Sequence, residues 1–100
     1  MTTTIQEQEG KIIAILSGEL DTAAAQETEK ALQPLLESNG KDIVIDCTSL
    51  EYISSSGLRV LLSILKQADS VGSKVTLKNV NDVIRDVMEL TGFITLFHFE

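Results

Sequence analysis

The sequence predicts an α/β domain over residues 1–100, with a mixed, mostly parallel sheet of about five strands and helices packed mainly on one face. Three observations support this. Short β-rich apolar runs alternate along the chain with apolar residues at helical spacing. One hundred residues suffice for one hydrophobic core. Strands that alternate with helices favour parallel pairing through right-handed crossovers, and crossovers that all step one way leave the helices on one face.

Two strands are expected at the start of the chain. Ile5–Glu9 is polar and weakly alternating, whereas Lys11–Leu16 is a β-rich apolar run. Gly10 can supply the positive φ that a tight hairpin between them requires. The segment Ser17–Asp21 is then expected to break the second strand. The position of the first strand in the sheet stays open.

A first helix is expected to follow, with Asp21 or Thr22 as its N-cap. It should extend to about Glu37, although Pro34 lies inside it and should kink or shorten it. The Ser-Asn-Gly segment at 38–40 should end this helix, with either of its last two residues as a left-handed cap.

The middle of the chain predicts a strand, a loop and a helix. Asp42–Asp46 is a short apolar run between charges, which is typical of a strand buried on both faces. Residues Cys47–Ser56 are expected to form a loop. Leucines then recur at helical spacing from Leu58 to Ala68, and Gly72 should end that helix.

The last third predicts a strand, a helix and a strand. Lys74–Lys78 alternates, with its two apolar residues facing inward. Asn79 or Asn81 can cap a third helix that Gly92 ends, and Leu96–Phe99 is the expected final strand. The apolar positions expected on the third helix are Val80, Val83, Ile84, Val87 and Leu90.

Composition excludes several functions. The formal net charge of −7 argues against nucleic acid or anionic lipid as a partner, because both require clustered Lys and Arg. No apolar run approaches the length of a membrane span, and no basic, apolar leader opens the chain. We therefore expect a cytoplasmic protein.

Catalytic and metal chemistry is not expected. Cys47 is the single cysteine and His98 the single histidine, so the chain can form neither an internal disulfide nor a Cys-rich metal site. No plausible Ser-His-Asp or Cys-His arrangement is present, and no Gly-rich phosphate loop precedes Lys-Ser/Thr. We expect no enzyme and no cofactor.

The candidate site lies where the parallel strands end and helices begin. Ser54-Ser55-Ser56-Gly57 opens the second helix, where a hydroxyl is accessible and a phosphoryl group on it would be stabilised by the free N–H groups. The serines can equally be simple helix caps. Asp21 can be a cap, shape a partner surface or help hold a metal–nucleotide complex. Asp46 can border the same site or simply end a strand.

These residues resemble a known family. Asp46–Leu58, with the sequence DCTSLEYISSSGL, is similar to the signature loop and helix start of STAS domains, and most like those of bacterial anti-sigma factor antagonists. Gly18–Asp21, GELD, resembles the turn before that family's first helix. Gly72, the Lys74–Lys78 strand and Thr91-Gly92-Phe93 also fit, so the resemblance covers essentially the whole chain.

The resemblance implies a regulatory cycle. The serine directly before the glycine, here Ser56, would be phosphorylated by a kinase that is itself the anti-sigma factor; Ser55 is the second candidate. The unphosphorylated form would bind this anti-sigma factor/serine kinase and so release the sigma factor. Phosphorylation would break the complex, and a metal-dependent serine phosphatase would reset it.

The partner-binding surface implied by the resemblance includes the first turn of the second helix. Arg59 could contact a partner carboxylate there or be an ordinary solvated arginine. The residues expected in this surface are Asp21, Ser54, Ser55, Ser56, Gly57, Leu58 and Arg59.

One position departs from the family pattern, because many phosphorylated members have Asp where this chain has Ser54. That departure favours a first alternative, a non-phosphorylated STAS scaffold or transporter-associated regulatory subunit. A second alternative is a nucleotide or small-ligand binding module that uses the same strand ends.

Overall fold

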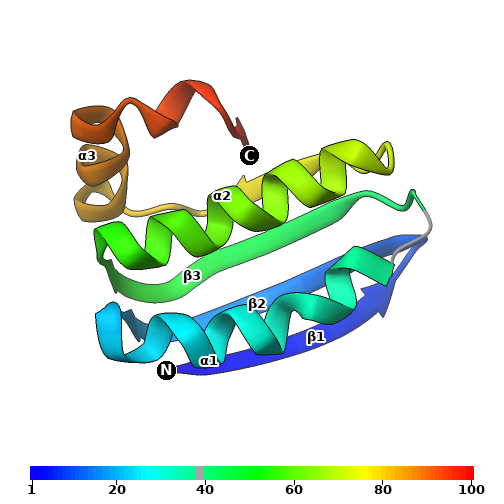
Figure 1. The fold of residues 1–100 in the computed structure, drawn as a ribbon, viewed down its shortest axis with the longest axis horizontal. Helices are drawn as coiled ribbons and strands as arrows, with labels where there is room; N and C mark the ends of the chain where they lie inside the picture. The colour runs from blue at the N-terminus through cyan, green and yellow to red at the C-terminus, as the bar shows by residue number, and fades with distance from the viewer. Residues whose placement is uncertain (38–39) are drawn as a thin grey trace.

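The computed structural model describes residues 1–37 and 40–100. Figure 1 shows the arrangement of the elements along the chain. In order they are β1 (Thr2–Gln8), β2 (Lys11–Leu20), α1 (Thr22–Leu32), the 3-10 helix η1 (Gln33–Glu37), β3 (Ile43–Ile53), α2 (Ser55–Ser70), β4 (Val75–Lys78), α3 (Asp82–Thr91), the 3-10 helix η2 (Phe93–Thr95) and β5 (His98–Phe99).

The sheet has five strands in the order β1-β2-β3-β4-β5. β1 is antiparallel to β2, and each later neighbour is parallel to the strand before it. The predicted mixed, mostly parallel sheet is therefore confirmed. The position of the first strand is also resolved: β1 lies at the edge, joined to β2 by a hairpin in which Glu9 and Gly10 have φ of 52° and 78°.

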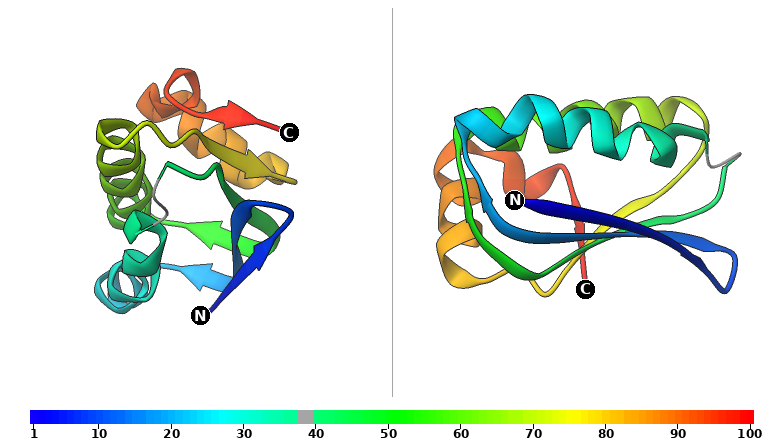
Figure 2. Two further views of the ribbon diagram at one scale, coloured as in Figure 1. Left: turned by 90° about the vertical axis from the view of Figure 1, so that its right-hand side faces the viewer. Right: turned by 90° about the horizontal axis from the view of Figure 1, so that it is seen from below.

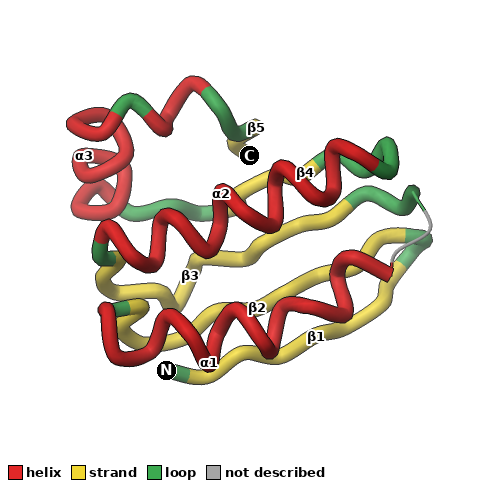
Figure 3. Tube along the Cα trace, in the orientation of Figure 1, coloured by secondary structure: helices red, strands yellow, loops and turns green. Residues whose placement is uncertain are grey.

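Two helices cover one face of the sheet. α1 and α2 run side by side over it, while α3 lies across the end of the sheet where α1 and α2 begin (Figures 2 and 3). The core fills the space between this face and the helices. Its largest fully buried side chains include Leu16, Leu20, Leu32, Ile43, Ile45, Ile53, Leu58, Leu61 and Leu77. None of the helices that the structure describes is long and apolar enough to cross a membrane.

β2 and β3 are both longer than predicted. The segment Ser17–Asp21 was expected to break β2, and Cys47–Ser56 was expected to be a loop. Instead the two strands stay paired as far as Leu20 and Ile53. The register shifts by one residue between the pairs Ile15–Asp46 and Ser17–Ser49, and again between Gly18–Leu50 and Glu19–Tyr52, so β3 carries two bulges. Polar residues are tolerated here because the two strand ends satisfy each other's backbone groups.

The first helix is shortened as its proline predicts. α1 ends at Leu32, and Pro34 lies in the 3-10 turn η1 that follows. Gly40 has a φ of 83°, whereas Asn39, the other candidate cap, lies outside the described residues.

Only part of the predicted apolar face of the third helix packs against the core. Ile84 and Met88 are fully buried, but Val83 is 56% exposed and Leu90 is 88% exposed. Because α3 packs across the end of the sheet, only a narrow stripe of it contacts other elements. Gly92 ends the helix with a φ of 78°, as predicted.

The final strand is shorter than expected. η2 follows α3 directly, and only His98 and Phe99 of the predicted Leu96–Phe99 strand pair with β4.

Candidate functional site

Three helix caps meet at one end of the sheet. Asp21 follows β2, Ser54 follows β3 and Asn81 follows β4, and these parallel strands end on the same side. Each side chain accepts a hydrogen bond from the first turn of its helix: Asp21 Oδ1 from Ala24 N at 2.9 Å, Ser54 Oγ from Gly57 N at 3.1 Å, and Asn81 Oδ1 from Ile84 N at 2.9 Å. The capping role of Asp21 and Ser54 is therefore observed directly.

The serine segment is fixed to the end of β2. The Ser54 N–H donates to the Leu20 carbonyl at 2.9 Å. Gly57 lies against the same residue, and a Cβ at position 57 would stand 2.9 Å from Ile53 Cγ1. This packing accounts for glycine after the three serines, and it holds the helix start in one position.

The three serines differ in environment. Ser54 is half-buried, and its hydroxyl oxygen is engaged as the cap. Ser55 is exposed on the first residue of α2. Ser56 is half-buried and lines a groove of about 420 Å³ between α1 and α2. The other lining residues are Thr22, Ala25, Gln26, Glu29, Arg59 and Val60.

The groove beside Ser56 holds one cation and one anion among its lining residues. Arg59 is exposed and comes from α2, one turn after Ser56, while Glu29 comes from α1 on the opposite wall. Ser56 therefore shares its groove with one guanidinium and one carboxylate.

Two residues of the predicted partner surface are buried in the structure. Gly57 is buried and Leu58 is fully buried, so neither side-chain position is available for a partner. Leu58 belongs to the core, which is the ordinary role of a leucine at helical spacing. In contrast, Tyr52 near the end of β3 is 42% exposed. It was missed because its segment was expected to be a polar loop, although a large aromatic in such a segment is itself a signal.

Asp46 makes its hydrogen bonds within the first bulge of β3. Its Oδ1 accepts from the Thr48 hydroxyl at 2.5 Å and from the Thr48 N–H at 3.0 Å, and Asn79 Nδ2 donates to Thr48 Oγ1 at 2.8 Å. These two hydrogen bonds from Thr48, with the charge of Lys78 adding to them, lower the pKa of Asp46 below its ordinary value of 3.8.

Cys47 cannot act as a thiolate at neutral pH. Its side chain is buried, and burial, aided by the neighbouring Asp46 charge, raises its pKa to about 12. His98 is exposed on β5. Within residues 1–37 and 40–100, no group of three His, Cys, Asp or Glu side chains is placed to hold a metal ion.

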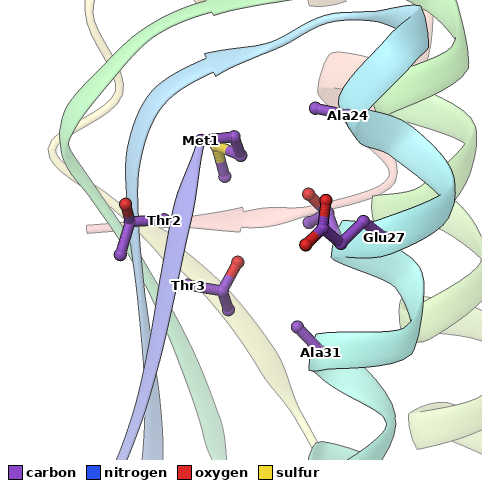
Figure 4. Close-up of a pocket in the computed structure, with 7 residues that line it drawn as sticks. Met1, Thr2, Thr3, Ala24, Glu27 and Ala31 are labelled. Atoms are coloured by element: carbon purple, nitrogen blue, oxygen red, sulfur yellow. The ribbon is translucent and has the colours of Figure 1, made fainter.

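A separate hollow of about 260 Å³ lies on the other flank of α1, against β1. Figure 4 shows Glu27 and Ala31 of α1 on one side and Thr2 and Thr3 on the other. The lining includes hydroxyls and one carboxylate but no Lys or Arg.

Comparison with known proteins supports the family resemblance. Residues 2–100 match the family model described as STAS domain. A Bordetella bronchiseptica protein provisionally named anti-sigma factor antagonist BtrV is 34% identical over 97% of this chain and 84% of its own length. An anti-sigma factor antagonist from Mycobacterium paratuberculosis has a TM-score of 0.82 at 25% identity, covering 98% of this chain and 83% of that one. The phosphorylated form of the Bacillus cell fate determinant SpoIIAA has a TM-score of 0.73 at 18% identity, covering 99% and 91%.

The family model thus spans nearly the whole chain, including the serine segment and the turn at Asp21. This chain belongs to the STAS domain family.

Proposed function

We propose that the chain is a cytoplasmic anti-sigma factor antagonist controlled by phosphorylation of Ser56. Its unphosphorylated form would bind an anti-sigma factor that is also a serine kinase, and so free the sigma factor. The observation that carries this proposal is the position of Ser56: its hydroxyl lines an open groove at a rigid helix start, while the hydroxyl oxygen of Ser54 is engaged as the cap. The anti-sigma factor antagonists among its relatives support the same role.

The proposed reaction uses this chain only as the acceptor. The Ser56 oxygen attacks the γ-phosphorus of ATP held by the kinase, the new O–P bond forms, and the bond to the ADP oxygen breaks. The serine proton passes to a base of the kinase. A serine phosphatase would reverse the modification by adding water to the phosphorus, which releases inorganic phosphate and restores the hydroxyl.

The proposed partner surface comprises Asp21, Ser54, Ser55, Ser56 and Arg59. Tyr52 adds an exposed aromatic near this end of the sheet, and tyrosine is enriched among the residues that dominate binding energy. A neighbouring hollow of about 470 Å³ includes four carboxylates in its lining, from Glu19, Asp21, Glu27 and Glu51. This acidic area favours a partner with basic residues opposite it.

Phosphorylation should alter binding without altering the fold. A phosphate adds a charge of about −1.5 to −2 at pH 7, and the first turn of a helix tolerates negative charge. Within a packed contact the same dianion must lose its hydration and repels nearby partner carboxylates. The change is therefore expected at the interface and not in the core.

An intact-mass experiment tests the proposal. Wild type, Ser55→Ala and Ser56→Ala are each incubated with magnesium-ATP and an anti-sigma-type serine kinase proposed as the partner, after that kinase has been shown to be active on another substrate. One added phosphoryl group on wild type and Ser55→Ala, and none on Ser56→Ala, is the expected result. No added mass on any of the three would reject the phosphorylation switch.

A second candidate is a non-phosphorylated STAS scaffold or transporter-associated subunit. The observation in its favour is Ser54, which replaces the aspartate of many phosphorylated members. Ser54 nevertheless makes the capping hydrogen bond, so the departure leaves the helix start intact. Binding of a partner that is indifferent to ATP would support this alternative.

A further inference from the structure

We infer that Arg59 is the intramolecular partner of the phosphoryl group on Ser56, so that phosphorylation withdraws this arginine from the partner surface. The inference rests on the proposed function only in taking Ser56 as the modified residue. It assigns Arg59 a role in the proposed phosphorylation switch. The phosphate on Ser56 would act directly on the position of the Arg59 side chain.

Helix geometry places the two residues together. Positions three apart on a helix are surface neighbours, with about 5–6 Å between their Cβ atoms. Ser56 and Arg59 both belong to α2 and line the same groove. An arginine side chain can span that separation, and its planar guanidinium can donate two parallel hydrogen bonds to phosphate oxygens.

Arg59 is free to make this contact. Within the described residues it takes part in no ion pair, whereas the other arginine, Arg85, lies over the ring of Phe99 at 4.9 Å from its centroid. Arg59 is also exposed, so its side chain has room to reorient toward Ser56. In the unphosphorylated protein its guanidinium is therefore available to a partner carboxylate.

The other charged residues near the groove explain why Arg59 is the expected partner of the phosphate. Glu29 on the opposite wall would repel the phosphate. Lys66 lies seven residues after Arg59 and lines a neighbouring hollow of about 340 Å³ with it, but that hollow does not include Ser56. Arg59 and Lys66 are thus two cations on one helix, of which only Arg59 shares a groove with the serine.

The first test uses protein with phosphoserine incorporated at position 56 during translation, so that no kinase is required. The second pKa of the phosphate is followed by ³¹P NMR titration in wild type, Arg59→Gln, Glu29→Gln and the matched control Lys66→Gln. A nearby cation favours the dianion, so Arg59→Gln should raise this pKa by about 0.2–0.7 pH unit. Glu29→Gln should lower it by less, and Lys66→Gln should leave it nearly unchanged.

Equal shifts in Arg59→Gln and Lys66→Gln, or no shift in either, would overturn the pairing of Arg59 with the phosphate. Because the kinase takes no part, that result would leave the proposed function standing. Thermal melting of each variant checks that the fold is kept, as expected for exposed or half-buried surface residues.

The second test concerns withdrawal of Arg59 from the partner. The affinity of the anti-sigma-type kinase is measured for phosphorylated and unphosphorylated forms of wild type and Arg59→Gln. If the phosphate removes Arg59 from the interface, phosphorylation should cost Arg59→Gln a smaller fold-loss of affinity than it costs wild type. An equal fold-loss in both would show that Arg59 is not withdrawn.

Discussion

Gly57 lies against Leu20 without space for a side chain: a Cβ at position 57 would stand 2.7 Å from both Leu20 Cγ and the Leu20 carbonyl oxygen. Alanine in place of glycine within a helix normally stabilises it by roughly 0.5–1 kcal/mol. Here Gly57→Ala should instead destabilise the protein by about 1–3 kcal/mol, because backbone and core must shift. Urea unfolding followed by circular dichroism measures the difference. Ser55→Ala, at an exposed site in the same turn, should stay within about 0.5 kcal/mol of wild type, and equal stability of the two variants would contradict the steric argument.

The cap made by Ser54 can be tested by removing and then replacing its oxygen. Ser54→Ala leaves the Gly57 N–H without its acceptor and should cost about 1 kcal/mol of stability. Ser54→Asp supplies an acceptor and a charge that suits the helix start, so its stability should stay close to that of wild type. Chemical denaturation of the three proteins gives the comparison. If Ser54→Asp is as unstable as Ser54→Ala, the hydrogen bond is not what stabilises this helix start.

Asp46 gives stability that depends on pH. Its pKa in the folded protein lies below the ordinary value of 3.8, so the folded state binds this proton less readily than the unfolded state. The stabilisation is therefore fully present above pH 3.8 and is lost as the pH falls through the folded pKa. Asp46→Asn cannot titrate, so wild type should exceed it in stability at pH 7, and the gap should narrow in acid. A gap that stays constant from pH 7 to pH 3 would contradict a role for the charge.

The two sides of α3 should respond differently to substitution. Ile84→Ala removes a fully buried side chain and should cost about 2–5 kcal/mol, whereas Leu90→Ala changes a side chain that is 88% exposed and should cost less than about 0.5 kcal/mol. Thermal and urea unfolding of both variants measure these effects. A large loss for Leu90→Ala would mean that Leu90 is packed, as the sequence pattern predicted.

The sequence predicted the order and pairing of most elements because periodicity and helix caps are local signals. Asp21, Pro34 and Gly92 each act within their own turn, and each has the predicted effect. The three-serine segment was also located correctly at a helix start, since it combines a cap with a following apolar stripe.

The length of β3 could not be predicted in the same way. Thr48, Ser49 and Glu51 are exposed and polar, which is typical of a loop. They lie within a strand because Ser17–Leu20 pairs with this part of β3, and Thr48 and Glu51 are the extra residues at the two register shifts of that pairing. The exposed side of α3 was likewise missed, because the angle at which a helix crosses a sheet is set by tertiary packing. The environments of Ser54, Ser55 and Ser56 also depend on α1, which lies far from them in sequence.

The extension of β3 to Ile53 has a kinetic consequence. The serine segment, which we propose binds a partner, continues from an eleven-residue strand and is hydrogen bonded to β2, so its conformation is set during folding. A partner then finds the surface preorganised, and little conformational entropy remains to be lost on association. The association rate constant should accordingly be governed by diffusion and electrostatic steering, and should vary with ionic strength.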